Sequence, residues 1–133
     1  MFLALIIFIA GLSDDGDIVI KDQWMRPGAE KMATALYLTI ENNGSTADTL
    51  YSVSTEICKL VQIHETYSSG DLKGMREVDM IVIEPNSSFE LKPGSHHIMV
   101  MRLIKDIAVG DESEFTLYFK KAGDIKITAK AIN

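Results

Sequence analysis

Residues 36–41 read LYLTIE, and the three residues after them read NNG. Leucine, leucine and isoleucine alternate with tyrosine, threonine and glutamate, so the two sets of side chains face opposite ways in an extended chain. Asparagine and glycine tolerate the positive φ angles of tight turns. The stretch therefore predicts a half-buried β-strand that ends in a turn at residues 42–44.

The same period of two recurs in residues 115–120 and 125–130, which predicts two more half-buried antiparallel strands. No window of twelve or more residues repeats at the helical period, and the three prolines fall between apolar segments. Six further strands are expected at Ile18–Met25, Thr49–Val53, Lys59–Glu65, Met80–Ile83, Ser88–Leu91 and Ile98–Leu103. The sequence predicts an all-β fold, a Greek-key β-sandwich or barrel of about eight or nine short strands.

Length and composition fit a single domain. The chain has 133 residues and 47% hydrophobic content, which is enough to fill one core. Thirteen basic residues against 19 acidic ones give a net charge of −6, so nucleic acid is not expected as a partner. Cys58 is the only cysteine, which excludes an intramolecular disulfide. Its place in the apolar run ICKLV predicts a small buried hydrophobic residue.

The first thirteen residues have features of an export signal. Nine apolar residues, Phe2–Ala10, precede the stretch GLS at 11–13, which supplies small residues at the positions that a signal peptidase requires and so predicts cleavage before Asp14. The run is too short to span a bilayer comfortably. Because no lysine or arginine precedes it, an uncleaved anchor and an ordinary buried strand stay open as alternatives. We expect residues 1–13 to be a signal peptide or a retained anchor, and residues 14–133 to form the folded domain.

Two histidine–methionine pairs form the most specific pattern in the chain. Ten residues separate His64 from Met75, one residue separates His97 from Met99, and 21 residues lie between the pairs. Side chains two apart in a strand share a face, so His97 and Met99 can converge on one ion. His64 is expected at a strand end, and Met75 after the polar loop at residues 68–71. The sequence predicts a metal site made of these four residues.

Thioether sulfur is a soft, uncharged ligand that suits Cu(I) better than Zn²⁺, Mg²⁺ or Ca²⁺. We expect one Cu(I) per chain, with binding that weakens below the imidazole pKa of about 6.5. Alternation turns His96 to the other face, and leaves Met101 as a reserve ligand or an apolar wall. In the alternative interpretation, Met75, Met99 and Met101 fill gaps in the core and the two histidines lie at the surface.

These residues resemble the signature of the periplasmic copper chaperones called PCu(A)C, which is H-x10-M-x21-H-x-M. Residues 75–78 and 91–101 are similar to the family's M-R-x-V and L-x-P-G-x-H-x-M-x-M stretches. Residues 24–27, WMRP, and 35–42, ALYLTIEN, are similar to its opening strands. The resemblance covers the chain from about Ile18 to Ala131.

The resemblance implies a cupredoxin-like Greek-key β-sandwich that binds one Cu(I) at a solvent-accessible site in the periplasm and passes it on. It implies that His64, Met75, His97 and Met99 are the ligands. Its implied partners are copper donors and acceptors, with the copper centres of cytochrome c oxidase as the recipient class, and a membrane only if the N-terminal segment is retained. Residues 71–74, DLKG, lack a methionine that is common there in relatives.

Two other classes of protein remain as alternatives. An electron-transfer cupredoxin needs a cysteine thiolate beside two histidines and a weak axial methionine, and Cys58 lies upstream of His64 on an expected strand. A metal-free immunoglobulin-like interaction module would make the spacing accidental. An enzyme is not expected, because all three histidines lie in or beside the proposed site and neither G-x-S-x-G nor H-E-x-x-H occurs.

Overall fold

Ten β-strands make up the regular structure of residues 17–133, which are the residues described by the computed structural model. The strands are β1 (Ile18–Met25), β2 (Thr34–Asn42), β3 (Asp48–Thr55), β4 (Cys58–Ser69), β5 (Leu72–Glu77), β6 (Ile81–Ile83), β7 (Ser87–Leu91), β8 (His96–Leu103), β9 (Glu112–Phe119) and β10 (Gly123–Ala131). Within this part of the chain, no helix is long and apolar enough to cross a membrane. The expected leader at residues 1–13 lies outside the described residues.

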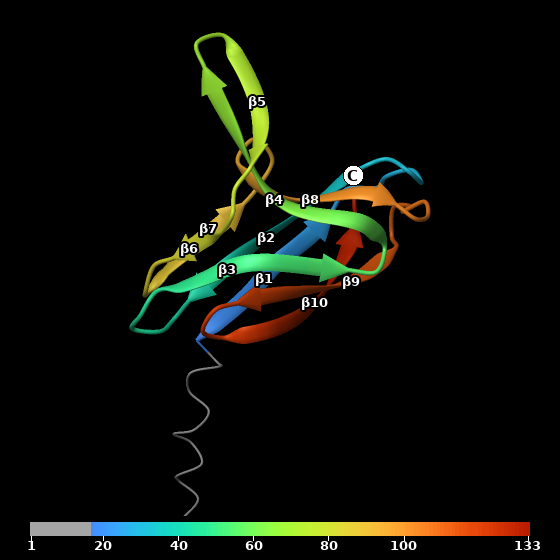
Figure 1. The fold of residues 1–133 in the computed structure, drawn as a ribbon. Coiled ribbons are helices and arrows are strands. Elements are labelled where there is room, and N and C mark those ends of the chain that lie inside the picture. The colour runs from blue at the N-terminus through green and yellow to red at the C-terminus, as the bar shows by residue number, and fades with distance from the viewer. Residues whose placement is uncertain (1–16) are drawn as a thin grey trace, which may run out of the picture.

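Nine of these strands form one hydrogen-bonded path in the order β5-β4-β8-β2-β1-β10-β9-β3-β6, and β7 pairs with β2 beside it. β1 and β10 pair in parallel, whereas the other ladders are antiparallel. The path curls over on itself, with β4 and β8 on one side of the body and β9 and β10 on the other (Figure 1). The predicted all-β sandwich is confirmed.

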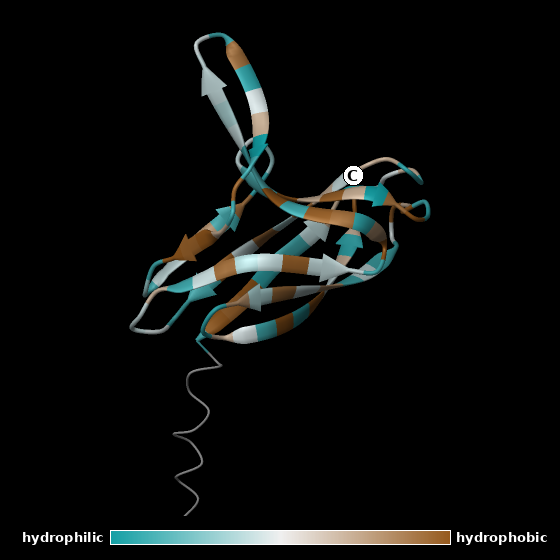
Figure 2. Ribbon diagram, viewed as in Figure 1, coloured by the Kyte–Doolittle hydropathy of each residue, from teal (hydrophilic) through white to brown (hydrophobic). Residues whose placement is uncertain are grey.

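The core lies between the two sides of the curled sheet, and the alternation of β2 and β9 fills it. Apolar and polar segments alternate along most strands of the body (Figure 2). The inward side chains of β2 and β9, each at most 2% exposed, are Leu36, Leu38, Ile40, Phe115, Leu117 and Phe119. Burying one such side chain contributes about 1.5–3 kcal/mol, so a register that turned these residues outward would lose the core.

The outer face of β2 is also covered, which the alternation alone did not predict. Tyr37 is only 7% exposed, and its ring centroid lies 4.7 Å from that of Trp24 on β1. β2 therefore separates the main core from a second, aromatic layer.

Strand β5 is the element that the sequence did not predict. β4 runs on to Ser69, four residues beyond its expected end at Glu65, and β5 returns antiparallel to it, so the pair projects from the body as a hairpin (Figure 1). Ser69 opposes Leu72, which leaves Gly70 and Asp71 as a two-residue turn, and Gly70 has φ +64°. Glycine at the first central position is typical of a type II′ hairpin turn. The expected polar loop at residues 68–71 is thus only a two-residue turn, because Ser68 and Ser69 belong to β4.

The turn between β7 and β8 sets the start of the strand that carries His97. Ser95 donates its backbone N–H to the Lys92 carbonyl oxygen at 3.0 Å, and Gly94 between them has φ +85°. Proline at the second position and glycine at the third define a type II turn, because only glycine adopts that φ without strain. Residues 92–95 therefore form a tight turn immediately before β8.

Candidate metal centre

The β4–β8 ladder places three side chains of interest on one face of the sheet. His64 directly opposes His97, and Gln62 directly opposes Met99. Opposed residues of an antiparallel ladder project from the same face, and so do residues two apart in one strand. The ring centroids of His64 and His97 lie 5.7 Å apart, with the planes inclined at 61°. The two predicted histidine ligands therefore meet edge to face.

The projecting hairpin brings the fourth residue to the same face. Met75 on β5 opposes Thr66, which lies two residues beyond His64 on β4. All four predicted ligands thus share one face of the three adjacent strands β5, β4 and β8. The expectation that His64 stands at a strand end was wrong, because β4 continues past it and uses the extension to hold Met75.

A small cavity of about 230 Å³ opens at this place. Met75, His97 and Met99 line it, whereas His64 is not among its lining residues, although its ring centroid lies 5.7 Å from that of His97. Its other lining residues are Arg26, Pro27, Ala33, Thr34, Ala35, Tyr37, Thr66 and Gly94. Met75 is 59% exposed and His97 is 3% exposed, so the cavity has a buried imidazole floor and an open thioether side. This exposure contradicts the interpretation of Met75 as a core filler and of His97 as a surface residue.

The hydrogen bonds of the two imidazoles fix which nitrogen carries a lone pair. The Nε2–H of His64 donates to the side-chain oxygen Oε1 of Gln62 at 2.8 Å, and the Nδ1–H of His97 donates to the carbonyl oxygen of Ser95 at 3.3 Å. A neutral imidazole has one N–H and one acceptor nitrogen. The acceptors are therefore Nδ1 of His64 and Nε2 of His97.

These two nitrogens are buried and have no hydrogen-bond partner within residues 17–133. An unpartnered buried acceptor costs about 1–3 kcal/mol, so such atoms call for an explanation. Metal-ligating histidines commonly use one nitrogen for the metal and donate the other N–H to a carbonyl or a carboxylate. The donor set of this chain fits that arrangement, with two imidazole lone pairs and two thioethers on one face.

Burial also lowers the pKa of His97 below its usual 6.5. The hydrogen bond to Ser95 opposes this shift, whereas the neighbouring imidazoles of His64 and His96 reinforce it. A lowered pKa keeps the lone pair of His97 available in mildly acidic solution.

Sequence reasoning missed three residues at the cavity: Arg26 and Tyr37, which line it, and Trp24, which packs against both. The Tyr37 ring lies 6.3 Å from the His97 ring, and the Arg26 guanidinium lies 5.4 Å from the Trp24 ring centroid and 5.6 Å from that of Tyr37. Trp24 and Arg26 belong to the WMRP stretch, and Tyr37 to the decisive β2 stretch. The motif signalled that these positions matter, but only the pairing of β1 with β2 brings them together.

His96 and Met101, whose roles the sequence did not decide, are not among the residues that line the cavity. His96 faces the opposite side of β8, where its Nε2 is 3.4 Å from a Glu65 carboxylate oxygen and its ring packs 4.9 Å from that of Phe89. Met101 opposes Leu60 and is half-buried.

Cys58 lies far from this site. It is six residues before His64 on the same strand, which is about 20 Å at the rise of an extended chain. It is partly buried against the core, its Sγ–H donates to the Leu60 carbonyl oxygen, and burial raises the pKa of the thiol. The geometry excludes a thiolate from the His–Met cluster.

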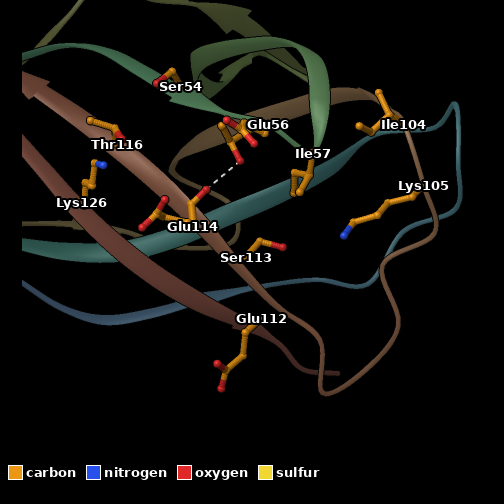
Figure 3. A pocket seen from close by; sticks show the side chains of 11 residues that line it. Ser54, Glu56, Ile57, Ile104, Lys105, Glu112, Ser113, Glu114, Thr116 and Lys126 are labelled. Atoms are coloured by element: carbon orange, nitrogen blue, oxygen red, sulfur yellow. Dashed lines mark hydrogen bonds between the residues drawn. The ribbon is translucent and has the colours of Figure 1, made fainter.

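The larger hollow of the molecule lies at the other end of β4 and β8. This cavity has a volume of about 590 Å³, and Figure 3 shows Glu56, Glu112 and Glu114 around it. Neither histidine nor methionine lines it. Within residues 17–133, no group of three or more His, Cys, Asp or Glu side chains is arranged to hold a metal ion.

Comparison with known proteins agrees with this geometry. The family described as "Putative lipoprotein LpqE-like" matches residues 18–131. An uncharacterized protein of Rickettsia prowazekii (strain Madrid E) is 28% identical over 115 residues, and a putative lipoprotein of Leifsonia xyli subsp. xyli is 27% identical over 110 residues. The alignments cover 83% and 82% of this chain but only 64% and 65% of the two relatives.

Solved structures show the same fold. The copper-bound PCuAC domain from PmoF2 superposes with a TM-score of 0.75 and 29% identity, over 88% of this chain and 93% of that domain. The solution structure of a CuI-loaded protein from Deinococcus radiodurans gives a TM-score of 0.68 at 21% identity, over 93% of this chain and 85% of that one. The cupredoxin-like architecture that the motifs implied is confirmed, and the chain belongs to the LpqE-like, or PCu(A)C, family.

Proposed function

We propose that this chain is a copper carrier, which binds one Cu(I) through His64, Met75, His97 and Met99 and passes it to an acceptor. The observation that carries the proposal is the pair of buried, unpartnered nitrogens, Nδ1 of His64 and Nε2 of His97, on the face that also holds both thioethers. The copper-bound domain from PmoF2 has the same fold, which supports copper as the cargo.

The donor set favours Cu(I) over other ions. Two neutral imidazoles and two thioethers contribute no negative charge, so the bound ion keeps its single positive charge. A dication would be poorly stabilised here, because soft neutral sulfur is a weak ligand for Zn²⁺ and for harder ions. Glu65 does not change this balance, because it faces the opposite side of β4 and pairs with Arg76 at 2.7 Å.

The open side of the cavity supports transfer rather than storage. Met75 is 59% exposed on a projecting hairpin, so an acceptor's ligands can approach the ion from this side. The histidines are held by hydrogen bonds behind it. Cargo can therefore leave by stepwise ligand exchange that begins with a flexible thioether, and no acid–base or nucleophilic catalyst is required.

The cellular setting is the finer part of the proposal. We place the protein outside the cytoplasm, in the periplasm, because one relative and the family carry the name putative lipoprotein and residues 2–13 have the features of an export signal. The proposed acceptor is cytochrome c oxidase or one of the factors that assemble its copper centres, as the family resemblance implies. The partners are copper donors and acceptors, and a membrane only through a retained leader.

Electron transfer is the competing metal-dependent function. It requires a thiolate ligand, and Cys58 lies about 20 Å along β4 from His64. This distance favours the carrier. A metal-free interaction module leaves the two buried imidazole nitrogens unexplained.

Anaerobic titration of the purified chain with Cu(I) against a colorimetric chelator tests the proposal. We expect one tight equivalent, and a loss of affinity of at least about tenfold in each of His64→Ala, Met75→Ala, His97→Ala and Met99→Ala. His96→Ala and Met101→Ala are the matched controls, one histidine and one methionine outside the cavity, and each should bind within about twofold of the native chain. A stoichiometry other than one, or native affinity in all four ligand variants, would refute the assignment.

A further inference from the structure

We propose that Arg26 forms an anion subsite beside the copper cavity and binds a carboxylate of the protein partner that exchanges Cu(I) with this chain. The inference rests on the proposed copper-carrier function and adds the chemistry by which the partner is recognised. Arg26 lines the same cavity as Met75, His97 and Met99.

Two aromatic rings hold the guanidinium in place. It lies 5.4 Å from the centroid of Trp24 and 5.6 Å from that of Tyr37, and these two rings lie 4.7 Å from each other. Stacking uses the face of a guanidinium and leaves its N–H edge available for a bidentate contact with a carboxylate. The side chain is thus ordered in advance, which reduces the entropy lost on binding.

The backbone at Arg26 is fixed as well. Its N–H donates to the Ala35 carbonyl oxygen at 3.2 Å, and its own carbonyl oxygen accepts a 2.7 Å hydrogen bond from the Thr34 hydroxyl. Both partners belong to β2, whose Ala35 opposes Met99. The position of the guanidinium is therefore tied to the strand that backs the copper ligands.

The charge of Arg26 is not neutralised within residues 17–133. None of the ion pairs in this part of the chain includes Arg26. They join Lys21 to Glu41, Arg76 to Glu65, Lys92 to Glu90 and His96 to Glu65. The whole chain carries a net charge of −6, so acidic groups are plentiful, yet no carboxylate of the described part of the chain pairs with this arginine. An exposed arginine beside the opening through which ligands exchange is placed to receive an acidic side chain from outside.

The direction of approach identifies the source of the carboxylate. Cargo exchange requires the partner's copper ligands to reach the exposed Met75 side of the cavity, and Arg26 lines that same cavity. An acidic residue next to the partner's copper ligands can therefore contact Arg26 while the ion is shared. Complementary charge of this kind raises the rate of productive encounter more than it changes equilibrium affinity.

Stopped-flow transfer from two synthetic Cu(I) peptides tests the inference. Both peptides carry the same methionine ligands, and they differ only in one flanking residue, glutamate or glutamine. We expect the glutamate peptide to load the native chain about three- to tenfold faster at low salt, with the difference shrinking as salt is added. Arg26→Gln should abolish the difference, and Arg26→Lys should restore part of it, because lysine keeps the charge but not the planar fork.

Lys120→Gln is the matched control, because it removes one exposed positive charge at the end of β9 and should keep the full preference for glutamate. Equal rates for the two peptides on the native chain, or a preference that survives in Arg26→Gln, would overturn the subsite. Equilibrium titration is run on every variant. If the native chain takes up no Cu(I) from either peptide, the copper-carrier proposal itself fails; if copper loads normally without charge preference, only the role of Arg26 fails.

Discussion

Gln62 controls the tautomer of His64, so replacing it by leucine is expected to weaken copper binding without touching a proposed ligand. The native Oε1 accepts the Nε2–H of His64 at 2.8 Å and leaves Nδ1 as the acceptor nitrogen. Leucine has a similar size but no acceptor. The imidazole can then move its proton to Nδ1, which removes the lone pair from the nitrogen proposed to bind copper.

The magnitude follows from the lost hydrogen bond. A neutral hydrogen bond of this kind contributes about 0.5–1.5 kcal/mol, and residues behind a metal ligand typically change metal affinity by about 10–100-fold. Because His64 is only half-buried, water can replace part of the contact, so the lower end of both ranges applies. We expect Gln62→Leu to bind Cu(I) about two- to tenfold more weakly, since about 0.5 kcal/mol corresponds to a factor of about two and 1.4 kcal/mol to a factor of ten.

Competition titration against a Cu(I) chelator measures the affinity, and nitrogen-15 NMR of the imidazoles reports which nitrogen of His64 carries the proton. Gln23→Leu is the matched control, because it removes the only other glutamine, a half-buried residue of β1 whose Nε2 donates to the Thr128 carbonyl oxygen. It should bind copper with native affinity. Native affinity in a folded Gln62→Leu variant, or an unchanged tautomer of His64, would refute the reasoning.

Three further outcomes are expected. Because the pKa of His97 is lowered in the folded chain, the unfolded state binds more protons in mildly acidic solution. The free energy of unfolding of the copper-free chain should therefore be greatest above pH 6.5 and decrease as pH falls below it. Urea unfolding at a series of pH values measures this, and His97→Leu should give a flatter profile. Gly94→Ala should cost about 1–2 kcal/mol in the same assay, because alanine is strained at φ +85°, and a neutral effect would argue against the type II turn. Cys58→Ser should keep native Cu(I) affinity, whereas loss of copper or of an intense blue Cu(II) band would point to a thiolate site.

The sequence was informative where one strand decides the outcome by itself. Alternation in residues 36–41 predicted β2 and its inward side chains. The same alternation, applied to the segment that begins at His96, separated His97 from His96, and the structure places these two side chains on opposite faces. The same reasoning failed for the β4–β5 hairpin, because glycine and aspartate at residues 70–71 have low strand propensity and β5 buries little apolar surface. The glycine of the type II′ turn was the signal that could have revealed it.

Contacts between distant segments were beyond the sequence. The approach of the Arg26 guanidinium to the Tyr37 ring depends on the β1–β2 register, which shifts between Lys21 and Trp24. Counting residues along the sequence therefore cannot place these two side chains beside each other. The hydrogen bond between Gln62 and His64 lies within one strand. Its proposed role in copper binding, however, depends on His97, which opposes His64 on the neighbouring strand. Pairing fixed the candidate ligands to one face, and tertiary contact then determined which atoms point into it.

The difference in exposure between Met75 and His97 gives the site a direction. The imidazoles are oriented by hydrogen bonds to Gln62 and Ser95, so little side-chain freedom is lost when they bind an ion. Met75 is exposed on a projecting hairpin, and its long flexible side chain loses more freedom on ordering. Its bond to copper should therefore be the first to break and the easiest for an acceptor to replace, while the histidines keep hold of the ion until the acceptor's own ligands are in place.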